Sequence, residues 1–173
     1  MIARRGHAVE QAPHASSLPP SVESVERALR ALGSEATVVM LPATGRTAQE
    51  AADAIGCEPA RIAKSLIFVG AQSGRPVLAL ISGSRRASLD ELAGAFGEKL
   101  RQANAGEVRA ITGYAIGGVP PVGYPQDVES FIDESLLEFE TVWAAAGHPH
   151  AVFEIESREL VRVTGAMPGP YGA

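Results

Sequence analysis

Two features of the sequence have residue types and spacing that suit chemistry on a carbonyl group. The first is the run Gly117–Gly118–Val119–Pro120–Pro121, which lies in the least regular segment of the chain, residues 113–123. Adjacent glycines let a ligand approach the main chain closely, and two prolines then stiffen the loop. Main-chain N–H groups held in this way can polarise a carbonyl or hold an oxyanion. A tight loop that only turns the chain would have the same composition.

The second feature is Lys64, which lies in the otherwise apolar run from Ile62 to Phe68. A lysine in a strand that is fit for burial must place its ammonium in a cleft, at an edge or against an anion. Desolvation would make that ammonium a good partner for a phosphate or for a developing negative charge. The alternative is an exposed lysine on an edge strand, where the charge guards against aggregation.

Other residues with reactive side chains give weaker signals. His148 and His150 flank Pro149, but no cysteine or third histidine stands near them, so a surface turn is favoured over a metal site. Cys57 follows a glycine that ends a helix and has no basic partner next to it in the sequence. No serine–histidine–aspartate arrangement can be recognised in the sequence.

Hydrophobic periodicity and capping signals predict the elements that position these residues. Thr47, with Glu50 three residues later, begins a helix that Gly56 ends, and Asn104 begins another. We expect further helices at 21–32, from Ser88 to about residue 96 and from Ser157, and strands at 36–41, 62–69, 76–81, 130–132, 141–145 and 151–155. Residues 1–20 are expected to be a flexible N-terminal tail, and residues 167–173 to be frayed. Helices interleaved with paired strands predict a single α+β domain with a mixed sheet.

The composition fits one globular domain with no need for disulfides or metal. The chain has 173 residues, of which 46% are hydrophobic and 20% charged, and a single cysteine excludes an intramolecular disulfide. No apolar run approaches the ~20 residues of a membrane span, so we expect a cytoplasmic protein. The net charge of −5 argues against strong nonspecific binding of nucleic acid. Basic residues are concentrated between Arg46 and Arg109, however, so one face could be locally basic.

Several motifs in order resemble the YbaK and prolyl-tRNA-synthetase-associated editing domains. The resemblance runs from about residue 22 to residue 166 and rests most on the lysine motif together with the GxxxP loop. The motifs are Thr47–Ala52 before Gly56, Ile62–Leu66, Gly113–Gly123, Ile132–Asp133 and Val142–Trp143. We take residues 21–167 as the editing domain.

This resemblance implies a mixed, barrel-like sheet surrounded by helices, and hydrolysis of the ester that joins a wrong amino acid to the 3′ end of tRNA. Lys64 matches the family lysine, which helps to hold the terminal adenosine. Gly117 matches the glycine of the GxxxP loop, and main-chain amides of Gly117 and Gly118 would hold the substrate carbonyl. A ribose hydroxyl of the substrate would assist the attacking water, so neither a metal nor another cofactor is implied.

The sequence departs from YbaK proper, which prefers cysteinyl-tRNA. The serine and aspartate of that branch fall near Ala145 and Val152, and neither residue can replace them. We therefore expect a sister branch that removes another small amino acid by a size sieve, in which one methylene is worth about 1–3 kcal/mol. Substrate contacts are predicted at Met40, Arg46, Thr47, Ser65, Ser82, Val119 and Pro121.

The leading hypothesis is a freestanding deacylase that acts on the acceptor end of a mischarged tRNA, such as tRNA-Pro. Its acidic charge suggests weak affinity for tRNA, so a prolyl-tRNA synthetase or an elongation factor would be a natural further partner. The alternatives are a non-catalytic module that binds tRNA or a synthetase, and a hydrolase of other small esters.

Overall fold

The computed structural model describes residues 18–173. Most of the predicted tail, residues 1–17, therefore lies outside the described residues. The first helix begins inside the range predicted as tail, at Pro20, and its N-cap is Pro19 and not Ser21 as expected. Leu18 already packs against the main core, so the ordered domain begins before residue 21.

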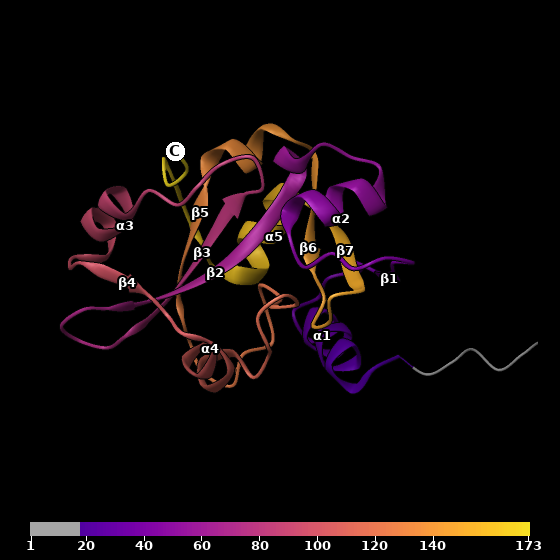
Figure 1. Cartoon of the computed structure of the whole chain (residues 1–173), viewed down its shortest axis with the longest axis horizontal. Coiled ribbons are helices and arrows are strands. Elements are labelled where there is room, and N and C mark those ends of the chain that lie inside the picture. Colours follow the sequence, from indigo (N-terminus) through magenta and orange to yellow (C-terminus); the bar gives the residue numbers. More distant parts are fainter. Residues whose placement is uncertain (1–17) are drawn as a thin grey trace, which may run out of the picture.

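The described residues form five α-helices, two short 3-10 helices and eight strands in one mixed sheet (Figure 1). The helices are α1 Pro20–Ala31, α2 Ala48–Ile55, α3 Leu89–Phe96, α4 Ala105–Thr112 and α5 Ser157–Thr164, with η1 Pro59–Arg61 and η2 Glu134–Glu138. The strands are β1 Val38–Met40, β2 Ile62–Gly70, β3 Pro76–Ser82, β4 Leu100–Gln102, β5 Glu129–Asp133, β6 Thr141–Ala145, β7 Ala151–Glu156 and β8 Met167–Gly169. This architecture confirms the predicted fold class. No helix within residues 18–173 is long and apolar enough to cross a bilayer.

The sheet carries apolar clusters on both of its faces. Its strands run in the order β1-β7-β6-β2-β3-β5-β8, and β4 pairs with β2 outside this path. The larger cluster includes Ile67, Leu80 and Phe153 together with residues of α1, α4 and α5. A second cluster on the opposite face joins Phe68 and Phe131 to α3. The central strands β2 and β3 are therefore sandwiched between two layers of side chains.

Local capping chemistry explains where several helices begin and end. The Thr47 hydroxyl accepts from the N–H of Glu50 at 3.1 Å, as its spacing predicts, and α2 ends at Gly56 with φ +84°. Asn104 and Glu107 form a complete capping box at α4. Ser157, in contrast, does not cap α5 as predicted: it is the first helical residue, and its hydroxyl donates to the carbonyl of Phe139 at 2.6 Å.

The C-terminal segment is ordered, so the prediction that residues 167–173 are frayed is wrong. Strand β8 pairs in parallel with β5, and the ring of Tyr171 packs edge-on against Phe131 with centroids 5.3 Å apart. Main-chain bonds then join Ala173 to Arg86 in both directions, at 2.8 and 3.0 Å. The sequence did not predict this strand because β8 has only three residues and contains Pro168, so it lacks the alternation of apolar and polar residues that indicates a strand. Strand β4, also three residues long, was missed for the same reason.

Because Tyr171 is 5% exposed and fills the second cluster, truncating it should destabilise the protein. We expect Tyr171→Ala to lower the free energy of unfolding in urea by about 3 kcal/mol, the range seen for aromatic-to-alanine changes in cores. Met167→Ala, in the same segment but at a side chain that is 60% exposed, should change it by less than about 0.5 kcal/mol. Equal effects of the two substitutions would show that the C-terminal segment contributes no core packing.

Candidate functional site

The central strand β2 has a break in its pairing along one edge. Its other edge pairs continuously with β3 from Ala63 to Val69. On the broken edge, β6 pairs only with Ile62 and Ala63, and β4 pairs only from Phe68 onward. Residues 64–67 therefore have no strand beside them there, although the carbonyl of Ile67 accepts from the N–H of Ala103 at 3.0 Å.

A cavity of about 470 Å³ opens at this break. Residues 64–67 all line it, and its wall also includes the start of α2, the glycine–proline loop and the ends of β6 and β7. Its lining residues are Gly45, Arg46, Thr47, Ala48, Gln49, Ala51, Ile62, Ala63, Lys64, Ser65, Leu66, Ile67, Gly83, Gln102, Ala103, Val108, Ile116, Gly117, Val119, Trp143, Ala144, Ala145 and Val152.

The cavity receives side chains from both faces of the sheet, because successive residues of a strand point to opposite faces. Ser65 shares the face of its neighbour Ile67, which belongs to the larger core cluster. Lys64 shares the face of Leu66, which packs with the second cluster. A ligand at the break therefore meets an apolar inner wall on one side and the lysine on the other.

Lys64 is half-buried and holds its ammonium by a main-chain contact. Its Nζ donates to the carbonyl of Arg85 at 2.5 Å. Burial lowers the pKa of Lys64, the positive charge of Arg86 lowers it further, and the carboxylate of Asp133 opposes both. Among residues 18–173, no carboxylate lies within salt-bridge distance of this ammonium. Although β2 has strands on both sides, Lys64 lies in the stretch where one edge is unpaired, and its charge remains available for an anion in the cavity.

The glycine–proline loop is held in place by its main chain. Gly117 has φ +99°, and a side chain there would meet the Arg46 side chain at 3.3 Å. The N–H of Gly118 donates to the carbonyl of Ala115 at 3.2 Å, and its carbonyl accepts from Gly147 at 2.8 Å. The N–H of Gly117 finds no acceptor among the described residues. Of the two predicted amide donors, Gly117 is therefore the one that is free to reach a ligand, and Gly118 anchors the loop.

Ser65 brings unsatisfied polar groups to the break. Its Oγ is the one buried side-chain N or O atom without a hydrogen-bond partner among residues 18–173. The carbonyl of Ile67 faces the broken edge, and main-chain groups two residues apart in a strand face the same edge. The N–H and C=O of Ser65 therefore also face the break, where no strand pairs with them.

The structure brings six of the ten predicted site residues together in the cavity wall: Arg46, Thr47, Lys64, Ser65, Gly117 and Val119. The other four lie outside that wall. Met40 is 40% exposed on the edge strand β1, and Ser82 turns its hydroxyl to the carbonyl of Ala60 at 2.9 Å. Pro121 is buried in the loop, and Gly118 packs against the main chain of His148. Direct substrate contacts by these four gain no support from the geometry.

Sequence reasoning did not assign a role to several residues of the wall. Trp143 appears in the sequence resemblance only as part of a motif, and no motif or pattern indicates a role for Ile116, which is 61% exposed beside Gly117. Tryptophan on a strand gives no signal of its own, because the same residue type fills cores. Ala145 and Val152, which the sequence resemblance singled out, pair with each other across β6 and β7, and both line the cavity.

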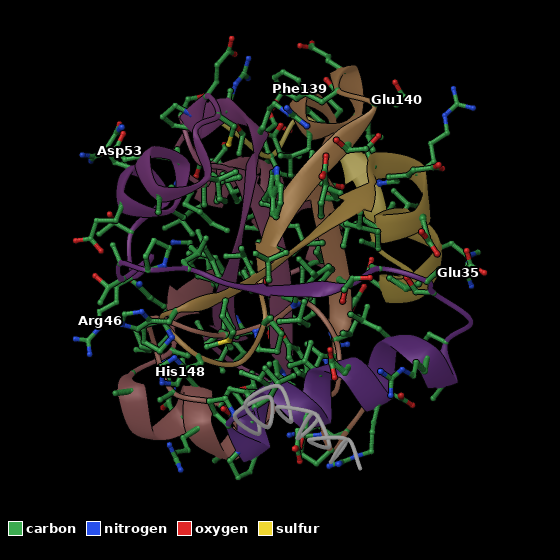
Figure 2. All side chains as sticks on the ribbon, turned by 90° about the vertical axis from the view of Figure 1, so that its right-hand side faces the viewer. Glu35, Arg46, Asp53, Phe139, Glu140 and His148 are labelled. Atoms are coloured by element: carbon green, nitrogen blue, oxygen red, sulfur yellow. The ribbon has the colours of Figure 1, made fainter. Side chains whose placement is uncertain are left out.

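The weaker candidates stay apart from this arrangement. His148, labelled in Figure 2, lies between β6 and β7 and accepts at Nδ1 from the N–H of His150 at 3.1 Å. Neither histidine is among the residues that line the cavity. Within residues 18–173, no three histidine, cysteine, aspartate or glutamate side chains gather closely enough to hold a metal ion. Burial raises the pKa of the Cys57 thiol, which lies in a separate depression beside Arg61.

The close approach of Gly118 to His148 can be tested by adding one carbon. A Cβ at Gly118 would lie 2.7–2.9 Å from main-chain atoms of His148, so Gly118→Ala must displace one of the two loops. We expect the free energy of unfolding in urea to fall by about 2 kcal/mol, as for other overpacked sites. Gly94→Ala is the matched control: it lies in α3 with open space around it and should be neutral or stabilising. A Gly118→Ala protein as stable as wild type would mean that the loops are not held in contact.

Comparisons with known proteins agree with this geometry. A family model described as "Aminoacyl-tRNA editing domain" matches residues 42–163. The uncharacterised protein YwhH of Bacillus subtilis is 34% identical over 140 residues, which cover 81% of this chain and 88% of YwhH. EbsC of Enterococcus faecalis, named as a candidate Cys-tRNA(Pro)/Cys-tRNA(Cys) deacylase, is 29% identical over 122 residues, or 70% of this chain and 74% of EbsC.

A similar solved structure has the same fold over its whole length. The crystal structure of a candidate trans-editing enzyme for prolyl tRNA synthetase superposes with a TM-score of 0.86 at 46% identity. The match covers 91% of this chain and 99% of that one.

Proposed function

Because this chain belongs to the family of aminoacyl-tRNA editing domains, we propose that it hydrolyses the ester bond between a tRNA and a wrongly attached amino acid. The observation that carries the proposal is the cavity at the break in the sheet. It is lined by both Lys64, which is half-buried, and Gly117, whose main-chain N–H has no acceptor within residues 18–173. One group suits the anionic nucleotide, and the other suits the developing oxyanion of an ester.

The reaction requires positioning more than it requires a protein nucleophile. Water adds to the ester carbonyl, the bond to the ribose oxygen breaks, and that oxygen takes up the proton released by the water. The N–H of Gly117 would stabilise negative charge on the carbonyl oxygen, because its loop is already held in shape and needs no rearrangement. The unpaired carbonyl of Ser65 would accept from the substrate ammonium. A neighbouring ribose hydroxyl would orient the water.

The cavity wall favours a small amino acid. The terminal adenosine and the aminoacyl group must share about 470 Å³. Where the cysteinyl-specific branch has a serine and an aspartate, Ala145 and Val152 offer only apolar contact. We propose that the substrate is tRNA-Pro, or another tRNA, to which a small wrong amino acid other than cysteine is attached. The similarity to a candidate trans-editing enzyme for prolyl tRNA synthetase supports tRNA-Pro.

The negative net charge of the chain suggests that another protein helps to bring the tRNA to it. The net charge is −5, so general attraction to a polyanion is weak, and the cations at the cavity are few. A prolyl-tRNA synthetase or an elongation factor would raise the local concentration of the substrate, and such a role would place the protein in the cytoplasm. A non-catalytic tRNA-binding module of the same fold remains the alternative function, and single-turnover hydrolysis distinguishes the two.

The proposal predicts release of amino acid from a panel of tRNA-Pro molecules charged with alanine, serine, threonine, 2-aminobutyrate or cysteine. At least one of the first four should be deacylated faster than the cysteinyl ester, because Ala145 and Val152 offer no polar partner to a thiol. Labelled aminoacyl-tRNA under single-turnover conditions gives the rates. If none of the five esters is hydrolysed above the rate without protein, the chain is not a deacylase of this kind.

Replacing the cavity lysine should slow deacylation strongly. We expect Lys64→Ala to reduce kcat/KM by about 100-fold, as for other single charge-stabilising groups in active sites. Lys99 is the other lysine of the chain and is exposed outside the cavity, so Lys99→Ala is the matched control and should keep nearly full activity. Circular dichroism spectra of both variants would establish that they fold. Equal activity of Lys64→Ala and Lys99→Ala would contradict the assigned role.

A further inference from the structure

The cavity has one aromatic side chain in its wall, and the proposed reaction does not use it. Trp143 lies in the middle of β6, pairs in parallel with Ile62 and is the only aromatic residue that lines the cavity. Trp143 packs against the small apolar cluster of Ala51, Ala52 and Ile62 under α2, as Ile55 also does. The residue is half-buried and belongs to the cavity wall.

Trp143 shares its face of the sheet with a lysine, a carboxylate and a small side chain. The carboxylate is that of Glu154, the antiparallel partner of Trp143 on β7, which lies 3.4 Å from the guanidinium of Arg61. Paired residues of neighbouring strands share a face, so Trp143 lies on the face of Ile62 and, two residues farther along β2, of Lys64. Ala145, two residues farther along β6, also points to this face and has a small side chain. Ala48, at the start of α2, packs against the same apolar cluster and also lines the cavity.

We propose that Trp143 is the stacking platform for the base of the terminal adenosine. This inference rests on the proposed function, since it assigns part of the same cavity to part of the same substrate. Every base offers a π-face, and an indole is a large aromatic surface that can replace the stacking the base loses when it leaves the tRNA end. No other described residue that lines the cavity has an aromatic ring.

The assignment divides the cavity between the two parts of the substrate. The base lies against Trp143 on the face that Lys64 shares, where the ammonium is close to the ribose and phosphate. The aminoacyl group then reaches through the break toward Ser65, Ile67 and Val119, which form the inner wall. The ester lies between them, beside the N–H of Gly117.

Kinetics of two substitutions test the platform. Trp143→Leu should raise KM for a mischarged acceptor-stem minihelix by about 5- to 150-fold, the range for loss of one stacked base, with kcat within about threefold of wild type. Trp143→Phe, which keeps an aromatic face, should restore most of the affinity. Ile55→Ala is the control for packing under α2, since Ile55 belongs to the same cluster but does not line the cavity, and should leave KM unchanged. A Trp143→Leu enzyme with wild-type KM, or a Trp143→Phe enzyme as weak as Trp143→Leu, would overturn the proposal.

Fluorescence tests the same contact without catalysis, because Trp143 is the only tryptophan of the chain. Titration with an uncharged minihelix that ends in adenosine should quench its emission, and a minihelix whose terminal nucleotide lacks a base should not. No change with either minihelix, or equal quenching by both, would overturn the platform. If quenching depends on the base but no mischarged tRNA is hydrolysed, the platform stands and the proposed reaction fails.

Discussion

The site depends on incomplete pairing along one edge of β2. A central strand normally satisfies its main chain on both sides, but here β6 leaves after Ala63 and β4 arrives only at Phe68. The gap leaves the main-chain N–H and C=O of Ser65 without a strand partner. It also opens a cavity within the sheet. Unpaired polar groups in a buried setting are costly, so they are retained where a ligand can satisfy them.

Helix α2, the Gly117 loop and the C-terminal segment surround this gap and position the groups in it. Thr47 caps α2 at one side of the opening, and the segment that leads into this helix supplies five successive lining residues, from Gly45 to Gln49. The loop at Gly117 approaches from another side and is fixed by its contact with the His148 segment. The ordered C-terminal segment binds Arg86 through Ala173, next to the carbonyl of Arg85 that receives the lysine ammonium. Residues far apart in the sequence thus determine where one charge lies.

Local signals made much of this predictable from the sequence. Thr47 with Glu50, and Asn104 by itself, marked their helix starts correctly because capping involves only neighbouring residues. Lys64 stood out because a charge inside an apolar strand is rare and requires a reason. The tertiary features were not predictable: the three-residue strands β4 and β8 exist only through their pairing partners. Two further features depend on tertiary contacts that the spacing of residues in the sequence does not reveal. The Gly118 N–H bonds within its own turn, and Trp143 lies in the cavity wall.

The central claim is that one cavity holds both the nucleotide and the reacting carbonyl. A crystal structure of the protein with a non-hydrolysable analogue, an adenosine that carries alanine through a 3′-amide bond, tests this most directly. The account predicts the amide carbonyl within hydrogen-bonding distance of the Gly117 N–H and the ribose beside Lys64. An analogue bound elsewhere, or bound with its carbonyl turned away from the Gly117 loop, would contradict it.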